Sequence, residues 1–240
     1  MPSAAAARRC YDVRTVERAE VLRYLGYAGQ PVTPELDARI DEVVARCLDA
    51  CRPCGVTRVF DVAGHGEKNG VPVIELAGTA LALEGRSIAE HLDGAVAVGV
   101  LAVTVGMGVE AELRRLSLTD RLAQVIFDAA GTAAVERAAD AAEADVVAAA
   151  AARGLHCGTR FSPGYGDLPL ATQPVLLGAL DAGRLLGITL SPALLMSPTK
   201  SVTAVVGLFE SPRPGVRSSC AGCPCRDFCV LLRAGSTCRG

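Results

Sequence analysis

Residues 158–169 read GTRFSPGYGDLP and form the most informative segment of the chain. One Arg, one Tyr, two Pro and three Gly fall within a single predicted loop. Pro163 stiffens the backbone, and Gly164 permits a positive φ or the close approach of another group. Arg160 carries a planar guanidinium suited to a carboxylate or phosphate, and Tyr165 carries a ring face and a hydroxyl. The segment therefore fits a binding loop, and equally a rigid turn whose Arg ties down carbonyl groups.

Two stretches around this loop resemble a known family. Residues 160–170 read RFSPGYGDLPL and, after a predicted helix, residues 187–207 read GITLSPALLMSPTKSVTAVVG. Together they resemble the activation domain of cobalamin-dependent methionine synthase, in which an R-P-A-P-G-Y type loop binds S-adenosylmethionine and precedes a helix and a serine-rich approach to the last strand. Other segments that look like stand-alone members of this family are VLRYLGY (21–27), SIAEHLDGA (87–95), VTVG (103–106) and FDAAGTAAVE (127–136). The resemblance spans roughly residues 15–210.

This resemblance implies an α+β fold, a mostly antiparallel twisted sheet with packed helices, over residues 1–210. It also implies a ligand site. Arg160 would hold the carboxylate of S-adenosylmethionine, Tyr165 would pack on the ligand or hydrogen-bond to it, and backbone groups of Ser162 and Gly164 would complete the pocket. The chain departs from the family at Val206, where a second aromatic contact would fall, and an acidic contact near the N-terminus is not placed. The chain is also shorter than the domain of full-length synthases, so the surface that faces cobalamin is expected to differ.

The implied function is that of a separate activation subunit. It would support reductive methylation of cob(II)alamin in a cobalamin-dependent methionine synthase, with the cobalamin and most of the synthase on another chain and an electron donor protein as a further partner. Such a protein holds a methyl group in position and needs no general base. Alternative hypotheses are a reactivator of another corrinoid methyltransferase that uses a redox or metal-binding tail, and a metal-binding interaction module.

A different class of function is indicated by residues 106–111, GMGVEA, which fit G-x-G-x-x-A. They follow a predicted buried strand and open a predicted helix, and residues 123–128 (AQVIFD) could form a second strand that ends in the acidic Asp128. That is the outline of a Rossmann-type nucleotide-binding enzyme using Gly106 and Gly108. The sequence that follows does not alternate strand with helix, so we prefer the interpretation that these glycines let a helix pack closely against a sheet.

Cysteines are concentrated near the C-terminus. Residues 211–219, SPRPGVRSS, have the composition of a linker, which places a boundary near residue 210. The tail 211–240 then carries Cys220, Cys223, Cys225, Cys229 and Cys238. Four thiolates can enclose Zn²⁺ or ligate an iron–sulfur cluster, and in so short a segment the metal would be the main source of folding energy. Redox or regulatory thiols remain the alternative. For Cys47, Cys51 and Cys54 we prefer small buried filler over a metal site.

Composition excludes several classes of protein. The chain has 240 residues, 50% hydrophobic and 21% charged, with a net charge of −2, which argues against disorder and against nucleic-acid binding driven by charge. The longest uncharged run, between Asp93 and Glu110, is shorter than the ~20 apolar residues of a membrane-spanning helix. The start of the sequence, MPSAAAARRC, lacks the apolar region of a secretory signal. We therefore expect a cytoplasmic protein with reduced thiols and no membrane partner.

Hydrophobic periodicity predicts the elements that would carry these sites. Thr33 and Pro34 begin a helix at 34–51, and Ser87 with Glu90 forms a capping box for a helix at 88–93. Further helices are expected at 109–153, capped at Thr119 and broken near Gly131, and at 174–186. Strands are expected at 56–62, 71–76, 95–105 and 200–209, with His65 in a polar loop between the first two and a loop at 154–172.

Overall fold

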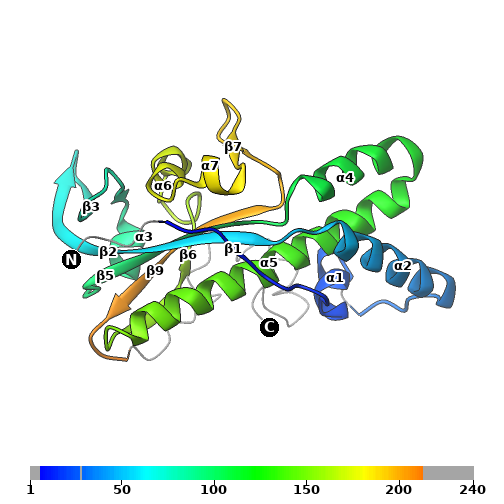
Figure 1. Ribbon diagram of the computed structural model, residues 1–240, viewed down its shortest axis with the longest axis horizontal. Helices are drawn as coiled ribbons and strands as arrows, with labels where there is room; N and C mark the ends of the chain where they lie inside the picture. Colours follow the sequence, from blue (N-terminus) through cyan, green and yellow to red (C-terminus); the bar gives the residue numbers. More distant parts are fainter. Residues whose placement is uncertain (1–5, 28, 213–240) are drawn as a thin grey trace.

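The computed structural model describes residues 6–27 and 29–212 (Figure 1). The helices are α1 (Arg18–Tyr24), α2 (Pro34–Ala50), α3 (Arg86–His91), α4 (Met107–Thr119), α5 (Arg121–Ala151), α6 (Gln173–Ala179) and α7 (Ala182–Leu186), with a 3₁₀ turn at Leu170–Thr172. The strands are β1 (Arg9–Cys10), β2 (Cys54–Lys68), β3 (Val71–Leu76), β4 (Ala82–Glu84), β5 (Ala97–Thr104), β6 (His156–Phe161), β7 (Thr189–Leu190), β8 (Met196–Ser197) and β9 (Ser201–Phe209).

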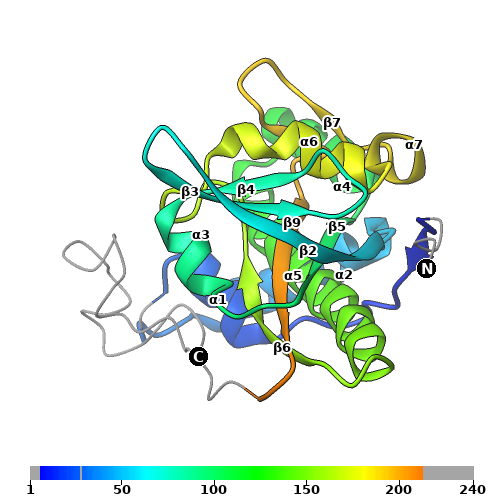
Figure 2. The ribbon, with the colours of Figure 1, turned by 90° about the vertical axis from the view of Figure 1, so that its left-hand side faces the viewer.

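One seven-stranded sheet organises the described chain. Its order is β4-β3-β2-β5-β9-β6, with β1 added to β2, and β7 and β8 form a separate pair. Every recorded pairing is antiparallel. Helices cover both faces: α5 runs along one face, while α6 and α7 lie over the other (Figure 1). The turned view in Figure 2 shows the same three layers. The predicted α+β class with a mostly antiparallel sheet is confirmed.

Small residues set the distance between α5 and the sheet. Every residue of β5 is buried, and Gly99 in its middle lies against α5. A Cβ built on Gly99 would lie 2.3 Å from Val146 Cγ1, so a side chain there would push the helix away. The buried face of α5 is itself mostly alanine, including Ala130, Ala134 and Ala138. Alanine and glycine therefore let the long helix lie closely on the sheet.

Several predicted elements are confirmed, with boundaries shifted. α2 begins where expected, with the Thr33 hydroxyl accepting a hydrogen bond from Leu36 N at 3.4 Å. β3 has the predicted bounds of 71–76. The loop predicted around His65 is wrong: β2 continues to Lys68, and His65 lies exposed opposite Ile74. The reason is the hairpin turn at Asn69-Gly70, where both residues have positive φ, an arrangement typical of the tightest hairpins.

Three further boundaries differ from prediction. The helical stretch breaks at Asp120, whose carboxylate accepts from Ala123 N at 2.9 Å, so the cap is Asp120 rather than Thr119. Gly131 lies buried inside α5, where a Cβ would be 3.3 Å from Val109 Cγ1. The predicted helix at 174–186 is divided into α6 and α7 at Asp181, which adopts a left-handed conformation. Finally, the predicted loop 154–172 begins with strand β6.

No helix within the described residues is long and apolar enough to span a membrane.

Candidate functional site

Strand β6 positions Arg160 at the edge of the sheet, beside α5. β6 pairs with β9, with Arg160 opposite Val206 and Phe161 opposite Val205, and the pairing is irregular between Cys157 and Arg160. Val206 is completely buried in the core that faces α5. Val206 is therefore a packing residue, and an aromatic ligand contact does not occur at this position.

Three carboxylates on α5 face the Arg160 guanidinium. Arg160 Nη2 lies 2.9 Å from Asp140 Oδ1 and 3.5 Å from Glu136 Oε2, and Arg160 Nε lies 3.2 Å from Glu143 Oε2. The three acidic residues are spaced four and three apart, so they lie on one face of the helix. We call Arg160, Glu136, Asp140 and Glu143 the Arg160 cluster. Its three carboxylates outnumber its one guanidinium, so the cluster has a net negative charge.

One nitrogen of Arg160 has no partner in the described chain. Its Nη1 atom is buried and makes no hydrogen bond among the described residues. The side chain as a whole is 20% exposed. A buried cationic N–H group without an acceptor destabilises the fold, because it has lost its hydrogen bonds to water and gained none in the protein. Nη1 is thus the one nitrogen of the Arg160 guanidinium that the described residues leave without an acceptor.

The loop after β6 presents Tyr165 to solvent. Gly164 and Gly166, on either side of it, have φ of +90° and +53°, a region that favours glycine. Gly164 N donates to Leu168 O at 2.9 Å, and Tyr165 N donates to Ser162 O at 3.1 Å. These bonds hold the turn while the Tyr165 side chain remains 68% exposed. The predicted backbone groups of Ser162 and Gly164 therefore take part in the loop's own turns.

The end of the same loop is fixed to α3. Asp167 accepts hydrogen bonds from the backbone N–H groups of Arg86 at 2.7 Å and Ser87 at 2.9 Å. These backbone donors hold the pKa of Asp167 below its ordinary value. The predicted capping box of Ser87 and Glu90 is wrong, because Ser87 lies inside α3 and the cap comes from Asp167, a residue distant in sequence. Leu168, fully buried beside it, anchors the loop in the core.

The sequence did not identify Glu136, Asp140 and Glu143 as part of this site. Their charges indicated only a solvent-exposed face of a helix. The available signal was the i, i+4, i+7 spacing of three acids with no basic residue at the matching positions. That spacing places the three acids on one face of the helix, but it does not identify the residue of another element that contacts them.

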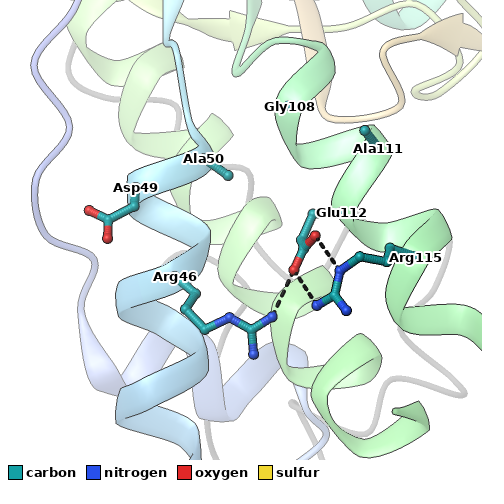
Figure 3. Close-up of a pocket in the computed structure, with 7 residues that line it drawn as sticks. All are labelled: Arg46, Asp49, Ala50, Gly108, Ala111, Glu112 and Arg115. Carbon is teal, nitrogen blue, oxygen red and sulfur yellow. Dashed lines mark hydrogen bonds and ion pairs between the residues drawn. The ribbon is translucent and has the colours of Figure 1, made fainter. Parts of the chain in front are cut away.

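A pocket in the described part of the chain lies elsewhere, between α2 and α4. Its volume is about 490 Å³, and its lining is Arg46, Asp49, Ala50, Gly108, Ala111, Glu112 and Arg115. Figure 3 shows Arg46 and Arg115 pointing to the Glu112 carboxylate, at 2.7 and 2.8 Å. Both guanidinium groups hold the pKa of Glu112 at about 2, with Arg115 the larger influence. This ion-pair network is self-contained, and the predicted ligand residues do not line it.

The Rossmann-type alternative is contradicted by the structure. β5 pairs antiparallel with both of its neighbours, β2 and β9, whereas a dinucleotide-binding unit needs parallel strands. Residues 123–128 lie inside α5, and Asp128 pairs with Lys200 at 2.8 Å. A Cβ on Gly108 would lie 2.7 Å from the carbonyl oxygen of Ala50. Gly108 therefore permits close packing, as preferred, but against the end of α2 rather than against the sheet.

The five tail cysteines, Cys220, Cys223, Cys225, Cys229 and Cys238, lie outside the described residues, as does most of the predicted tail 211–240. Within residues 6–27 and 29–212, no His, Cys, Asp or Glu side chains form a group of three or more that could hold a metal ion.

Comparisons with known proteins bear on the fold. No family model and no curated protein matches the chain. One solved structure, "Crystal Structure of the MetH Reactivation Domain bound to AdoHcy", is similar to it with a TM-score of 0.61 and 13% sequence identity. The match covers 88% of this chain and 81% of that chain. The chain therefore has the fold of the MetH reactivation domain.

Proposed function

We propose that the chain binds S-adenosylmethionine at the Arg160 cluster and serves as an activation subunit for a cobalamin-dependent methionine synthase encoded on a separate chain. The observation that carries this proposal is the buried, unpartnered Nη1 of Arg160 beside three carboxylates. The fold supports it, because a domain of the same fold is described as bound to AdoHcy.

The charges of the cluster match the charges of the ligand. S-adenosylmethionine has one carboxylate and two cationic groups, its ammonium and its sulfonium. The Nη1 of Arg160 supplies a donor for the carboxylate. The negative charge of Glu136, Asp140 and Glu143 in excess of Arg160 suits the two cations. A phosphate or a simple carboxylic acid carries no cationic group that could pair with these three carboxylates.

Tyr165 supplies the second recognition element. Its ring is presented outward between two glycines of positive φ, on the loop that directly follows the Arg160 strand. An exposed aromatic side chain on a fixed backbone can pack on a ligand at low entropic cost. We infer that the ring, rather than the backbone of Ser162 and Gly164, makes the second contact.

The proposed role is positional. When bound, S-adenosylmethionine supplies the methyl group, an electron donor protein supplies the electron, and the partner chain supplies the cobalamin that is returned to methylcobalamin. Arg160 and its acidic neighbours fix the amino-acid end of the ligand. The exposed side of the loop then leaves the methyl group accessible to the partner.

Calorimetric titration of the full chain tests the binding step. The Arg160→Ala variant should bind S-adenosylmethionine about 30–150-fold more weakly, the equivalent of about 2–3 kcal/mol for one charge-assisted contact. Arg153→Ala is the matched control, because Arg153 pairs with Asp61 on the surface and lies outside the cluster. 5′-Methylthioadenosine, which lacks the amino-acid end, should bind both variants and the wild type equally. Equal affinity of wild type and Arg160→Ala for S-adenosylmethionine would reject the site.

Reconstitution tests the role. The chain should restore methionine synthesis to an oxidised methionine synthase that lacks its own activation domain, given S-adenosylmethionine and a one-electron donor. Arg160→Ala should fail at ligand concentrations that saturate the wild type. If the chain binds S-adenosylmethionine tightly but restores no activity, the ligand site stands and the proposed role toward methionine synthase is rejected.

A further inference from the structure

The N-terminal strand places two cysteines side by side, away from the Arg160 cluster. β1 lies beside the start of β2 (Figure 1) and pairs with it antiparallel. In this register Cys10 lies directly opposite Cys54. Their Sγ atoms are 2.8 Å apart. Opposed residues of antiparallel strands have Cα atoms about 4.5–5.5 Å apart, which is within the range of about 4.4–6.8 Å that disulfides span. The two sulfurs can therefore be bonded without moving either strand.

Several contacts hold β1 in this register. Arg9 pairs with Asp145 of α5 at 2.6 Å, and the Tyr11 hydroxyl donates to the same carboxylate at 2.9 Å. Tyr11 N donates to Pro53 O at 2.9 Å. Tyr11 also packs over Gly55, where a Cβ would lie 2.9 Å from its ring. Because Arg9 and Tyr11 face α5, the alternation of a strand turns Cys10 to the opposite face, where Cys54 lies.

The two thiols differ in access. Cys10 is exposed, whereas Cys54 is 3% exposed and its burial raises its pKa. Arg8 Nη2 donates to Cys54 Sγ at 3.0 Å, so a cation lies beside the pair. The Arg8 guanidinium lowers the pKa of Cys54 in part, but burial is the larger influence, so the exposed Cys10 is the thiol placed to react first. The arrangement is that of an exposed attacking thiol with a buried resolving thiol next to it.

We propose that Cys10 and Cys54 are a redox-reactive dithiol that low-molecular-weight disulfides, of which oxidised glutathione is the probe, convert to an intramolecular disulfide. The Cys10 thiolate attacks one sulfur of the oxidant, forms a mixed disulfide and releases one thiol. Cys54 then attacks the Cys10 sulfur, which forms the Cys10–Cys54 bond and releases the second thiol. Two protein thiols are oxidised, one disulfide is reduced, and both thiol protons leave on the released thiols.

The bond would fasten the N-terminal segment to the sheet. Residues 10–54 include α1 and α2, and both helices pack on the α5 side of the sheet. A disulfide here closes that whole segment into one loop, which restricts the unfolded chain. Thiol reductants would reverse the bond by thiol–disulfide exchange. This inference is independent of the proposed ligand site.

Peptide mapping of the full chain tests the proposal. The chain is incubated with oxidised glutathione, the remaining thiols are alkylated, and tryptic peptides are identified by mass spectrometry. Residues 10–14 (CYDVR) should be linked to residues 47–58 (CLDACRPCGVTR), and dithiothreitol should release both. The second peptide also contains Cys47 and Cys51, so fragmentation of the linked pair must assign the bond to Cys54.

Variants keep the test decisive. Cys10→Ser and Cys54→Ser should each abolish the linked peptide, and Cys157→Ser should retain it. If Cys54→Ser impairs folding because Cys54 is buried, the Cys10→Ser variant still tests the proposal, because Cys10 is exposed. The proposal is overturned if Cys10 stays a glutathione mixed disulfide while Cys54 is alkylated, if Cys10 links to another cysteine, or if neither thiol reacts.

Discussion

Two glycine-rich connections in this molecule look alike in sequence and differ in what surrounds them. Residues 105–106 join β5 to α4, whose first turn includes Gly108, and the loop at residues 162–169 joins β6 to the 3₁₀ turn before α6. Beside the first, the Ala50 carbonyl fills the space that a Cβ on Gly108 would need, and the Thr104 hydroxyl accepts from Gly106 N at 3.1 Å. Beside the second, Arg160 Nη1 is buried without a partner in the described chain, and Tyr165 is exposed.

The difference shows what a glycine motif does and does not indicate. Glycine allows close approach, but the approaching group can be a ligand or another part of the protein. At Gly108 the neighbour is the end of α2, so the motif serves packing. Before the loop 162–169, the Nη1 atom of Arg160 has no acceptor among the described residues, and the proposed ligand site rests on this unpaired donor.

The largest effect on stability is expected at the packing turn. Gly108→Ala places a Cβ 2.7 Å from a backbone oxygen that cannot rotate away, so it should lower the free energy of unfolding by about 1–3 kcal/mol. Gly178→Ala is the matched control, since that helical glycine has no other atom within 4 Å of its would-be Cβ. The control should raise stability by about 0.5–1 kcal/mol through helix propensity alone. Urea denaturation of both variants measures the contrast.

The same comparison predicts what this turn does not bind. NAD and NADP should show no saturable binding at millimolar concentration, because β5 has only antiparallel neighbours and the acidic residue Asp128 lies within a helix. Saturable binding that Gly108→Val abolishes would contradict this interpretation of the turn.

The sequence predicts best those elements whose residues alone carry the signal. α2, β3, β5 and β9 follow from hydrophobic periodicity and from the Thr33-Pro34 start. The predicted boundary between α4 and α5 is wrong because Gly131 resembles a helix breaker, whereas in the structure it lies inside α5 with Val109 close to its Cα. The end of β2 follows from a local signal as well, because the Asn69-Gly70 pair favours a two-residue hairpin turn.

The site was less predictable, for a physical reason. The resemblance predicts Arg160 and Tyr165 as ligand residues, but it does not predict the partners of Arg160, which are about twenty residues away on α5. β6 itself carries few strongly apolar residues and lies at the edge of the sheet, so its periodicity is weak. Contacts between distant elements follow from the packing of the whole chain, which periodicity does not specify.

A smaller effect on the free energy of unfolding is expected where Asp167, in the loop 162–169, contacts the start of α3. Asp167→Ala removes the acceptor of two backbone N–H groups and should cost about 0.5–2 kcal/mol, the usual range for a helix cap. The folded-state pKa of Asp167 is lowered, so the carboxylate stabilises the fold above its unfolded pKa of about 3.9 and ceases to do so as the pH falls through the folded value.

Stability measured as a function of pH checks this sign. The loss caused by Asp167→Ala should be full near neutral pH and should shrink in acid, where the wild type loses the same contribution. A pH-independent loss would mean that the side chain acts through packing rather than through its charge.

The smallest effect concerns Tyr165 and separates its ring from its hydroxyl. Tyr165→Ala should weaken S-adenosylmethionine binding by about 0.5–1.5 kcal/mol, roughly 2–12-fold, because the ligand loses an aromatic face. Tyr165→Phe should retain most of the affinity, since an exposed hydroxyl exchanges water for ligand with little net gain. The side chain is 68% exposed, so neither variant should change the unfolding midpoint. Leu195→Ala, at another exposed apolar position, controls for general surface effects. If Phe binds as weakly as Ala, the hydroxyl is the contact, and the outward presentation of Tyr165 serves a hydrogen bond instead of ring packing.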